Sequence, residues 1–256
     1  VRINMDFIYG LPHQTVQSFS QTIRRAIQLQ PDRLVTFSYA HVPWVNKSQL
    51  LLEKAGLPAG EEKSNMYDTA RQLLKEAGYE AVGMDHFVRP DDELFTALQT
   101  KQLHRNFQGY CTRRTTGQVY AFGVTGISQL STAYSQNIKD ITAYIETINQ
   151  GGFAVTKGYS LSYEEQLTRE AIESLMCNGS LDWEELARQA GISSKTYRAA
   201  TAFNPERMNE FASDGLITWS EQNIQLTPKG AIFVRNVAAS LDKLMLHTTK
   251  SFSKPV

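Results

Sequence analysis

The first third of the chain alternates apolar runs with segments of helical spacing, and this alternation limits the possible folds more than any other feature. Residues 2–8 form a nearly continuous apolar run, which is typical of a strand whose two faces are both covered in a parallel sheet. Gly10-Leu11-Pro12 interrupts the run, most simply as a turn into a helix, and apolar residues then recur at helical spacing up to Pro31. A second apolar run at residues 33–39 completes a β-α-β unit.

A second helix and a third strand extend this pattern. After a Pro- and Gly-rich loop that ends at Gly60, apolar residues including Met66 and Leu74 share one helix face. Residues 79–84 are predicted as a strand, which gives the order β-α-β-α-β. Folds of this α/β class bind ligands at the carboxyl ends of their strands, so three groups of residues are expected to converge there. These groups are Asp6, Tyr39-Ala40-His41 and Asp85-His86.

A less regular stretch is expected at residues 89–129, and the chain beyond it is predicted to be mainly helical. A helix containing several isoleucines ends at Gly151-Gly152, which marks the expected boundary between a domain at residues 1–152 and another at residues 153–256. Helices are predicted in the second domain near residues 163–176, 182–190 and 205–212, followed by a hairpin at 216–226 and a final helix around 231–246. Three helices followed by a hairpin suggest a winged-helix-like module.

Charge and cysteine content narrow the function classes. The chain has 26 basic and 26 acidic residues, so no global charge favours nucleic acid or an anionic membrane as a partner. No apolar run approaches the roughly 20 residues of a membrane span. Two cysteines, Cys111 and Cys177, favour a reducing cytoplasm over a disulfide framework and are too few to ligate an iron–sulfur cluster. The opening Val1 suggests the interior start of a longer protein.

Histidines and acids at the expected strand ends invite a metal interpretation. His41, Asp85, His86 and His104 are ligand types suited to zinc or iron, but their spacing matches no compact metal motif. We therefore expect no metal ligands in this chain, and a metal-dependent barrel hydrolase remains a disfavoured alternative.

Two other polar features could carry chemistry. Asp6 interrupts an apolar strand, where a buried carboxylate needs a polar ligand, a cation, or structural pairing with Arg2 or Arg33. The segment at residues 103–110 places two aromatics among basic and amide side chains, and Arg105 could grip a carboxylate through its fork of donors. A surface loop whose polar groups satisfy each other is the alternative for that segment. The apolar, glycine-rich stretch at residues 123–128 could either close a barrel or let a ligand approach the backbone.

Four stretches resemble a known family. They are Asp6-Phe7-Ile8-Tyr9-Gly10-Leu11-Pro12, Phe37-Ser38-Tyr39-Ala40-His41-Val42-Pro43, residues 83–94 (GMDHFVRPDDEL) and residues 103–110 (LHRNFQGY). In their order and in their separations along the chain, these stretches resemble the oxygen-independent coproporphyrinogen III oxidases. The resemblance runs from the first residue into the C-terminal module. The resemblance implies an α/β fold: the C-terminal part of an incomplete (β/α)6 radical S-adenosylmethionine barrel, followed by a mainly helical, winged-helix-like domain.

The resemblance also implies a reaction, cofactors and partners. Members of this family oxidatively decarboxylate two propionates of coproporphyrinogen III to give protoporphyrinogen IX, using S-adenosylmethionine and a [4Fe-4S] cluster. The implied substrate is coproporphyrinogen III, with an unidentified electron donor and acceptor, and a cytoplasmic monomer without nucleic acid or membrane partners is expected. The family pattern assigns six residues to S-adenosylmethionine, namely Asp6, Ile8, Phe37, Ala40, Gln108 and Ile127, and leaves Arg105 as the candidate substrate ligand.

One departure from the family is informative. The family's Cys-x-x-x-Cys-x-x-Cys cluster motif does not occur in this sequence. The chain is therefore expected to correspond to the C-terminal portion of a longer parent, to contribute no catalytic residue and no metal ligand, and to be inactive alone. A winged-helix nucleic-acid-binding or regulatory protein is the alternative, but residues 157–256 contain 11 basic and 12 acidic side chains, which gives little affinity for phosphates.

Overall fold

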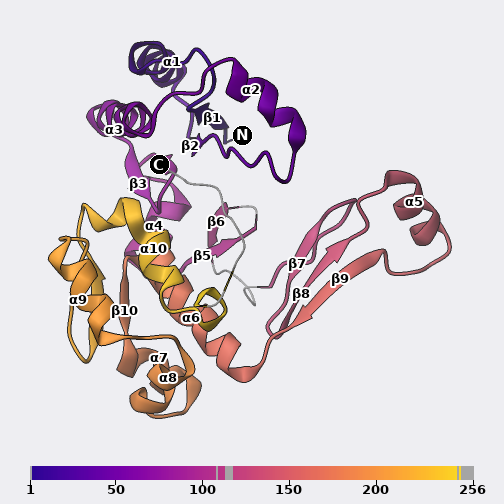
Figure 1. Cartoon of the computed structure of the whole chain (residues 1–256), viewed down its shortest axis with the longest axis vertical. Helices are drawn as coiled ribbons and strands as arrows, with labels where there is room; N and C mark the ends of the chain where they lie inside the picture. The colour runs from indigo at the N-terminus through magenta and orange to yellow at the C-terminus, as the bar shows by residue number, and fades with distance from the viewer. Residues whose placement is uncertain (1, 108, 113–117, 247, 249–256) are drawn as a thin grey trace. The chain divides into compact units, whose positions relative to one another are not determined.

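The computed structural model describes residues 2–107, 109–112, 118–246 and 248. Its internal contacts divide the chain into two compact units, the first formed by residues 1–99 with 248–256 and the second by residues 100–247 (Figure 1). This division differs from the predicted boundary at residue 152, because strands on either side of Gly151-Gly152 pair with each other within the second unit.

The first unit contains a four-stranded sheet in the order β1-β2-β4-β3. Strand β1 (Asn4–Tyr9) pairs in parallel with β2 (Arg33–Ser38), as the sequence pattern predicted. The third predicted strand is shorter than expected, β3 (Glu80–Val82), and it does not pair with β2. Instead Gly83, with a φ of +64°, turns the chain back into β4 (His86–Val88), which lies antiparallel between β2 and β3.

Two helices, α1 (Val16–Gln28) and α3 (Gly60–Glu76), pack on the same face of this sheet (Figure 1). Thr15 begins α1 with a capping box, in which its hydroxyl accepts from the Ser18 backbone N–H. The core between helices and sheet consists of Tyr9, Phe19, Ile23, Ala26, Leu34, Met66, Ala70, Leu73, Leu74, Tyr79 and Phe87. Because side chains alternate along a strand, Asp6 and Ile8 lie on the face opposite this core.

Short helices occupy segments where the sequence pattern gave only a loop. Asn46 caps η1 (Lys47–Gln49), which leads directly into α2 (Leu50–Lys54), and α4 (Glu93–Gln99) follows β4. These helices have at most two turns, so periodicity over so few residues gives little signal.

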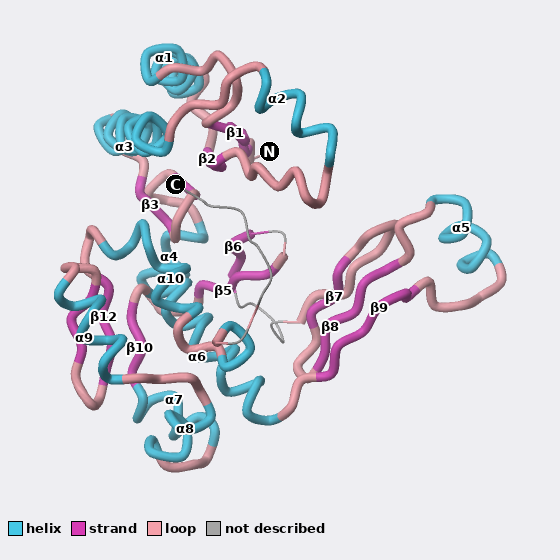
Figure 2. The backbone as a smooth tube through the Cα atoms, viewed as in Figure 1, coloured by secondary structure: helices cyan, strands magenta, loops and turns pink. Residues whose placement is uncertain are grey.

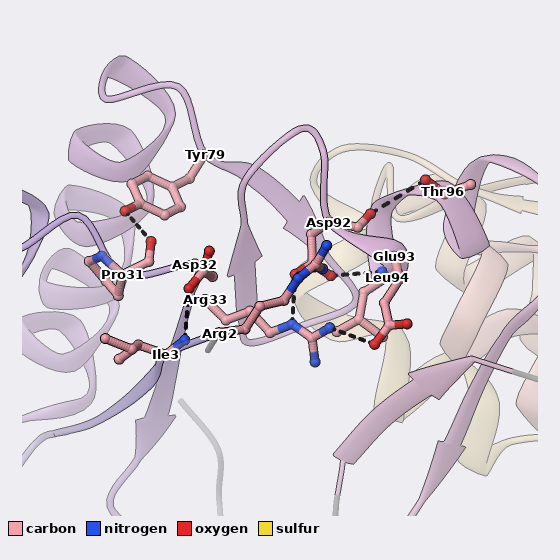
Figure 3. Close-up of polar contacts among 10 residues, drawn as sticks. All are labelled: Arg2, Ile3, Pro31, Asp32, Arg33, Tyr79, Asp92, Glu93, Leu94 and Thr96. Carbon is pink, nitrogen blue, oxygen red and sulfur yellow. Dashed lines mark hydrogen bonds and ion pairs between the residues drawn. The ribbon is translucent and has the colours of Figure 1, made fainter.

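An ion-pair cluster lies where the chain enters β1 and β2, at the amino ends of the strands (Figure 3). The buried carboxylate of Asp92 accepts from Arg2 at 3.2 Å, from Arg33 at 2.8 Å and from the Leu94 backbone N–H at 2.8 Å. Arg33 also pairs with Glu93 at 3.0 Å. The cluster ties the starts of two strands to the start of α4.

The second unit begins with a hairpin and a three-stranded antiparallel sheet. Strands β5 (Leu103–Asn106) and β6 (Gly109–Thr112) form the hairpin. Strands β7 (Ile127–Gln129), β8 (Ala133–Asn137) and β9 (Val155–Ser160) form the sheet in that order. The predicted isoleucine helix is α5 (Ile141–Asn149), capped by Asp140 and placed between β8 and β9.

The last part of the second unit is a helical module around a small sheet (Figure 2). It contains α6 (Tyr163–Asn178), β10 (Ser180–Asp182), α7 (Trp183–Ala190), α8 (Ser194–Ala200), α9 (Pro205–Ser213), β11 (Ile217–Trp219) and β12 (Asn223–Leu226), with sheet order β10-β12-β11. The predicted final helix is interrupted, as η2 (Gly230–Phe233), α10 (Val234–Ala239) and η3 (Lys243–Met245). The break occurs where the Asp242 carboxylate accepts from the Leu244 backbone N–H and starts a new turn.

Candidate functional site

Three of the predicted cofactor-binding residues share the face of the first sheet that lies opposite the helices. The strand register places Asp6 beside Val35 and Ile8 beside Phe37, and directly paired residues point to the same face of a sheet. Ile8 is 47% exposed and Phe37 is 38% exposed, although both are large and apolar. An exposed carboxylate beside two exposed apolar side chains is a surface suited to an amphipathic ligand.

The environment of Asp6 corrects one expectation and argues against one alternative. Asp6 is exposed, not buried, and its carboxylate accepts from the Asn4 amide at 2.7 Å. It also does not pair with Arg2 or Arg33, because both guanidiniums bind Asp92. Asp6 therefore has no structural ion pair with these arginines to explain it.

Ala40 lies in the segment that leaves β2, and Gln49 holds this segment in place. The Gln49 side chain accepts from the Val42 backbone N–H at 2.6 Å and donates to the Ala40 carbonyl at 3.2 Å. Ala40 is exposed and is positioned by these bonds immediately beyond the carboxyl end of β2.

Asp85 and His86 reach the same region by a different route from the one predicted. They follow β3, which runs in the same direction as β1 but does not pair with β2; His86 begins the antiparallel strand β4 and pairs with Val35. The register therefore aligns Asp6, Val35 and His86 in one row across the sheet. The Asp85 carboxylate lies 2.7 Å from Nδ1 of His86, which fixes the imidazole ring.

The turn before His86 is held by a half-buried phenol. The Tyr67 hydroxyl donates to the Met84 carbonyl at 2.6 Å, and burial raises the pKa of Tyr67 to about 12, so it remains a donor at neutral pH.

Sequence reasoning missed one residue at this edge, Lys63. Its side chain packs against Gly10, which has a φ of +84° just after β1. The two residues are far apart in sequence, and the only local signal was Gly10 itself, interpreted as a simple turn.

In the second unit, Arg105 is held in the hairpin formed by β5 and β6. It pairs with Tyr110 across the hairpin, and its guanidinium lies 5.6 Å from the centre of the Tyr110 ring. Its Nε is buried without a hydrogen-bond partner, and the described residues give the guanidinium no carboxylate. A cation held this way and lacking an anion is suited to a carboxylate ligand.

The two remaining predicted contacts belong to the second unit. Ile127 is half-buried and begins β7, where it pairs with Gln136. Gln108 lies outside the described residues.

Each of the described histidines considered as metal ligands lies near a carboxylate. His41 Nε2 lies 3.7 Å from Glu53, His86 Nδ1 lies 2.7 Å from Asp85, and His104 Nδ1 lies 2.5 Å from buried Glu173. Among the residues that the structure describes, no group of three histidine, cysteine or acidic side chains is arranged to hold a metal ion.

The cysteines do not fit an iron–sulfur cluster. Cys177 is buried in α6, and half-buried Cys111 accepts a long contact from the Asn106 amide at 3.5 Å. Two thiols are fewer than the ligands such a cluster needs. The Asp6, Ile8 and Phe37 surface, by contrast, fits an amphipathic cofactor such as S-adenosylmethionine.

This fold and site define a class. An α/β unit with a ligand-suited surface toward the carboxyl ends of its strands, followed by a helical module, is the arrangement of an α/β enzyme with an accessory domain. The HemN C-terminal domain family model matches residues 161–233. The chain is 36% identical over 256 residues to the oxygen-independent coproporphyrinogen III oxidase of Thermostichus vulcanus, covering 99% of this chain and 78% of that protein. The chain therefore belongs to the oxygen-independent coproporphyrinogen III oxidase family.

Other relatives are longer. The chain is 37% identical to the oxygen-independent coproporphyrinogen III oxidase of Helicobacter pylori strain J99, covering 98% of this chain and 54% of that protein. A solved structure of coproporphyrinogen III oxidase (HemN) from Escherichia coli, described as a radical SAM enzyme, matches with a TM-score of 0.85 and 37% identity. The match covers 94% of this chain and 55% of that one. The chain thus spans about half the length of most of these relatives.

Proposed function

We propose that this chain is the C-terminal portion of a radical S-adenosylmethionine enzyme that oxidatively decarboxylates two propionates of coproporphyrinogen III to give protoporphyrinogen IX. Its first unit would be the last part of an incomplete (β/α)6 barrel, and its helical module a winged-helix-like accessory domain. Family membership supports the activity. The position of β1 at the edge of its sheet supports the partial barrel, because a further parallel strand can pair there.

The observation that carries the proposal is the exposed surface formed by Asp6, Ile8 and Phe37 on the face of the sheet opposite the helices. The Asp6 carboxylate would accept from ribose hydroxyls or balance an ammonium group, while Ile8 and Phe37 provide apolar walls. Ala40, held by Gln49, would contribute a backbone contact beyond β2. From the family pattern, Gln108 and Ile127 are proposed as further contacts to S-adenosylmethionine in the whole protein.

Arg105 is proposed to bind a substrate propionate. Its guanidinium already has the Tyr110 ring on one side and lacks an anionic partner among the described residues. A bidentate pair with a propionate would satisfy its donors and orient the substrate.

The cofactors would be held partly outside this chain. With a [4Fe-4S] cluster, S-adenosylmethionine would supply the 5′-deoxyadenosyl radical that takes a hydrogen from the propionate β-carbon before carbon dioxide leaves. The cysteines that ligate the cluster would come from another part of the whole protein, so the chain alone would be inactive. We further propose a cytoplasmic monomer that works with an electron donor and acceptor. None of the described helices has the length and apolar content needed to cross a membrane.

The test of the proposed site uses the whole protein. Asp6→Asn should weaken S-adenosylmethionine binding and cleavage while leaving the iron content unchanged, since only a ligand contact is lost. The matched control is Asp68→Asn, which changes an exposed carboxylate on α3. The assignment would be contradicted if Asp6→Asn changed binding and turnover by no more than about twofold, which corresponds to a free-energy change well under 1 kcal/mol.

The substrate assignment is tested separately with Arg105→Ala and Arg105→Lys. The alanine variant should raise the coproporphyrinogen KM or lower turnover by about tenfold or more, since a charge-assisted hydrogen bond is lost. Lysine should recover part of the loss, because it keeps the charge without the planar fork. Unchanged kinetics with alanine would remove Arg105 from the substrate site.

A further inference from the structure

Lys63 and Gly10 form a contact that local structure does not require. Built onto Gly10, a Cβ atom would lie 2.9 Å from Cε, 3.1 Å from Cδ and 3.2 Å from Cγ of Lys63. The aliphatic part of the lysine therefore lies flat against the Gly10 backbone. Any side chain at residue 10 would displace it and would also strain a backbone with a φ of +84°.

The contact lies at the carboxyl edge of the first sheet. Gly10 directly follows β1, and β3 runs in the same direction as β1 because both β2 and β3 are antiparallel to β4. Helix α3 leads into the start of β3, so its first turn, which contains Lys63, lies at the opposite, carboxyl edge. Ligands of α/β folds bind at this edge.

The Lys63 ammonium has no counter-ion among the described residues. In the part of the chain that the structure describes, Lys63 is half-buried and has neither a hydrogen bond nor an ion pair. Burial lowers the pKa of Lys63, and no neighbouring carboxylate offsets this effect. At the amino edge, by contrast, half-buried Arg33 binds both Asp92 and Glu93.

We propose that Lys63 is an anion-binding residue that takes a carboxylate of the ligand bound at the carboxyl edge, and that residue 10 must be glycine to seat it. This inference rests on the proposed function and deepens it. Both proposed ligands carry the required group, S-adenosylmethionine as its methionyl carboxylate and coproporphyrinogen as its propionates. An ion pair between the Lys63 ammonium and this carboxylate would replace the interaction with water that burial of the lysine removes.

Three substitutions separate a binding role from a packing role. Lys63→Met keeps length and helix propensity but removes the charge, and Lys63→Arg keeps the charge. The control, Lys75→Met, changes an exposed lysine at the other end of the same helix. In urea unfolding of this chain, Lys63→Met should be as stable as wild type or more stable, because an uncompensated half-buried charge is removed. A clear loss of stability would show a structural role and overturn the proposal.

Binding to the whole protein identifies the source of the carboxylate. The probes are S-adenosylmethionine, followed by calorimetry, and coproporphyrin III, a stable oxidised analogue followed by fluorescence. Lys63→Met should weaken one of them by about tenfold or more, whereas Lys63→Arg should stay within about threefold and Lys75→Met should be unchanged. A weaker cofactor identifies the methionyl carboxylate, and a weaker porphyrin identifies a propionate. Binding of both probes within about twofold of wild type would overturn the inference.

A chemical readout keeps this inference separate from the proposed function. Acetylation of Lys63 in this chain, measured by mass spectrometry, should be slowed by succinate relative to chloride at equal ionic strength, whereas acetylation of Lys75 should not. If wild type bound neither probe, the proposed function would fail, and succinate protection would still support a carboxylate site at Lys63. If succinate gave no protection, the Lys63 assignment would fail even in a protein that binds both probes.

Discussion

At the residue scale, partly buried charged side chains at the two edges of the first sheet differ in their partners. At the amino edge Asp92 is 1% exposed and balances Arg2 and Arg33, so the cluster stabilises the strand starts (Figure 3). At the carboxyl edge the half-buried cation Lys63 has no counter-ion among the described residues. Charges that are paired within the fold contribute to its stability, whereas Lys63, which has no ion pair among the described residues, is the residue that we propose for anion binding.

Asp92→Asn should destabilise this chain by about 2–4 kcal/mol, because it removes a buried carboxylate and leaves two guanidiniums without it. Burial opposes ionisation of Asp92, but hydrogen bonds from Arg33 and the Leu94 backbone N–H outweigh it and lower the pKa of Asp92. The interactions of the Asp92 carboxylate therefore contribute their full stability above the ordinary aspartate pKa. This contribution is lost as the pH falls through the lower pKa that Asp92 has in the folded state.

The measurement is urea unfolding of both proteins from neutral pH to about pH 3, around the ordinary aspartate value. Wild type should lose stability on acidification more steeply than Asp92→Asn. Equal slopes would mean that Asp92 is not the group responsible. Asp91→Asn, an exposed neighbour, is the matched control.

At the scale of elements, helix ends show how far local sequence specifies structure. Ser162 caps α6 in a reciprocal box with Glu165: the serine hydroxyl accepts from the Glu165 backbone N–H at 3.2 Å, and the glutamate accepts from the Ser162 backbone N–H at 2.7 Å. These bonds satisfy donors that a helix start otherwise leaves unpaired.

Ser162→Ala should therefore lower the free energy of unfolding by about 1 kcal/mol. Ser213→Ala, at the exposed end of α9, should change it by less than about 0.5 kcal/mol. Equal effects of the two substitutions in chemical denaturation would show that the capping box does not stabilise α6.

At the scale of the whole molecule, the chain has a cofactor-suited surface but not the cluster ligands. We expect it to bind no iron–sulfur cluster after anaerobic reconstitution, because Cys111 and Cys177 are too few and Cys177 is buried in a helix. Iron analysis and visible absorbance check this. About four irons per chain in stoichiometric yield would contradict it.

Local pattern predicted many elements well, because their signals lie within a few neighbouring residues. The apolar runs predicted β1 and β2 to within two residues, and the helix predicted near residues 205–212 is α9 (Pro205–Ser213). Helix α1 and α3 were predicted from periodicity, since the residues of their buried faces recur at helical spacing. The family resemblance similarly depends on short contiguous motifs.

Pairing between distant segments could not be obtained in this way. Only the tertiary structure showed that β4 inserts antiparallel between β2 and β3, that Asp6 is exposed, and that Arg2 and Arg33 bind Asp92. The Lys63 contact with Gly10 belongs to the same group. Helical and strand periodicity depends on near neighbours, whereas strand order and charge pairing depend on which distant groups the whole chain can bury together. The local sequence pattern therefore predicted the longer helices and the first two strands, and its short motifs predicted the family, whereas strand order and the pairing of charges followed from the packing of distant segments.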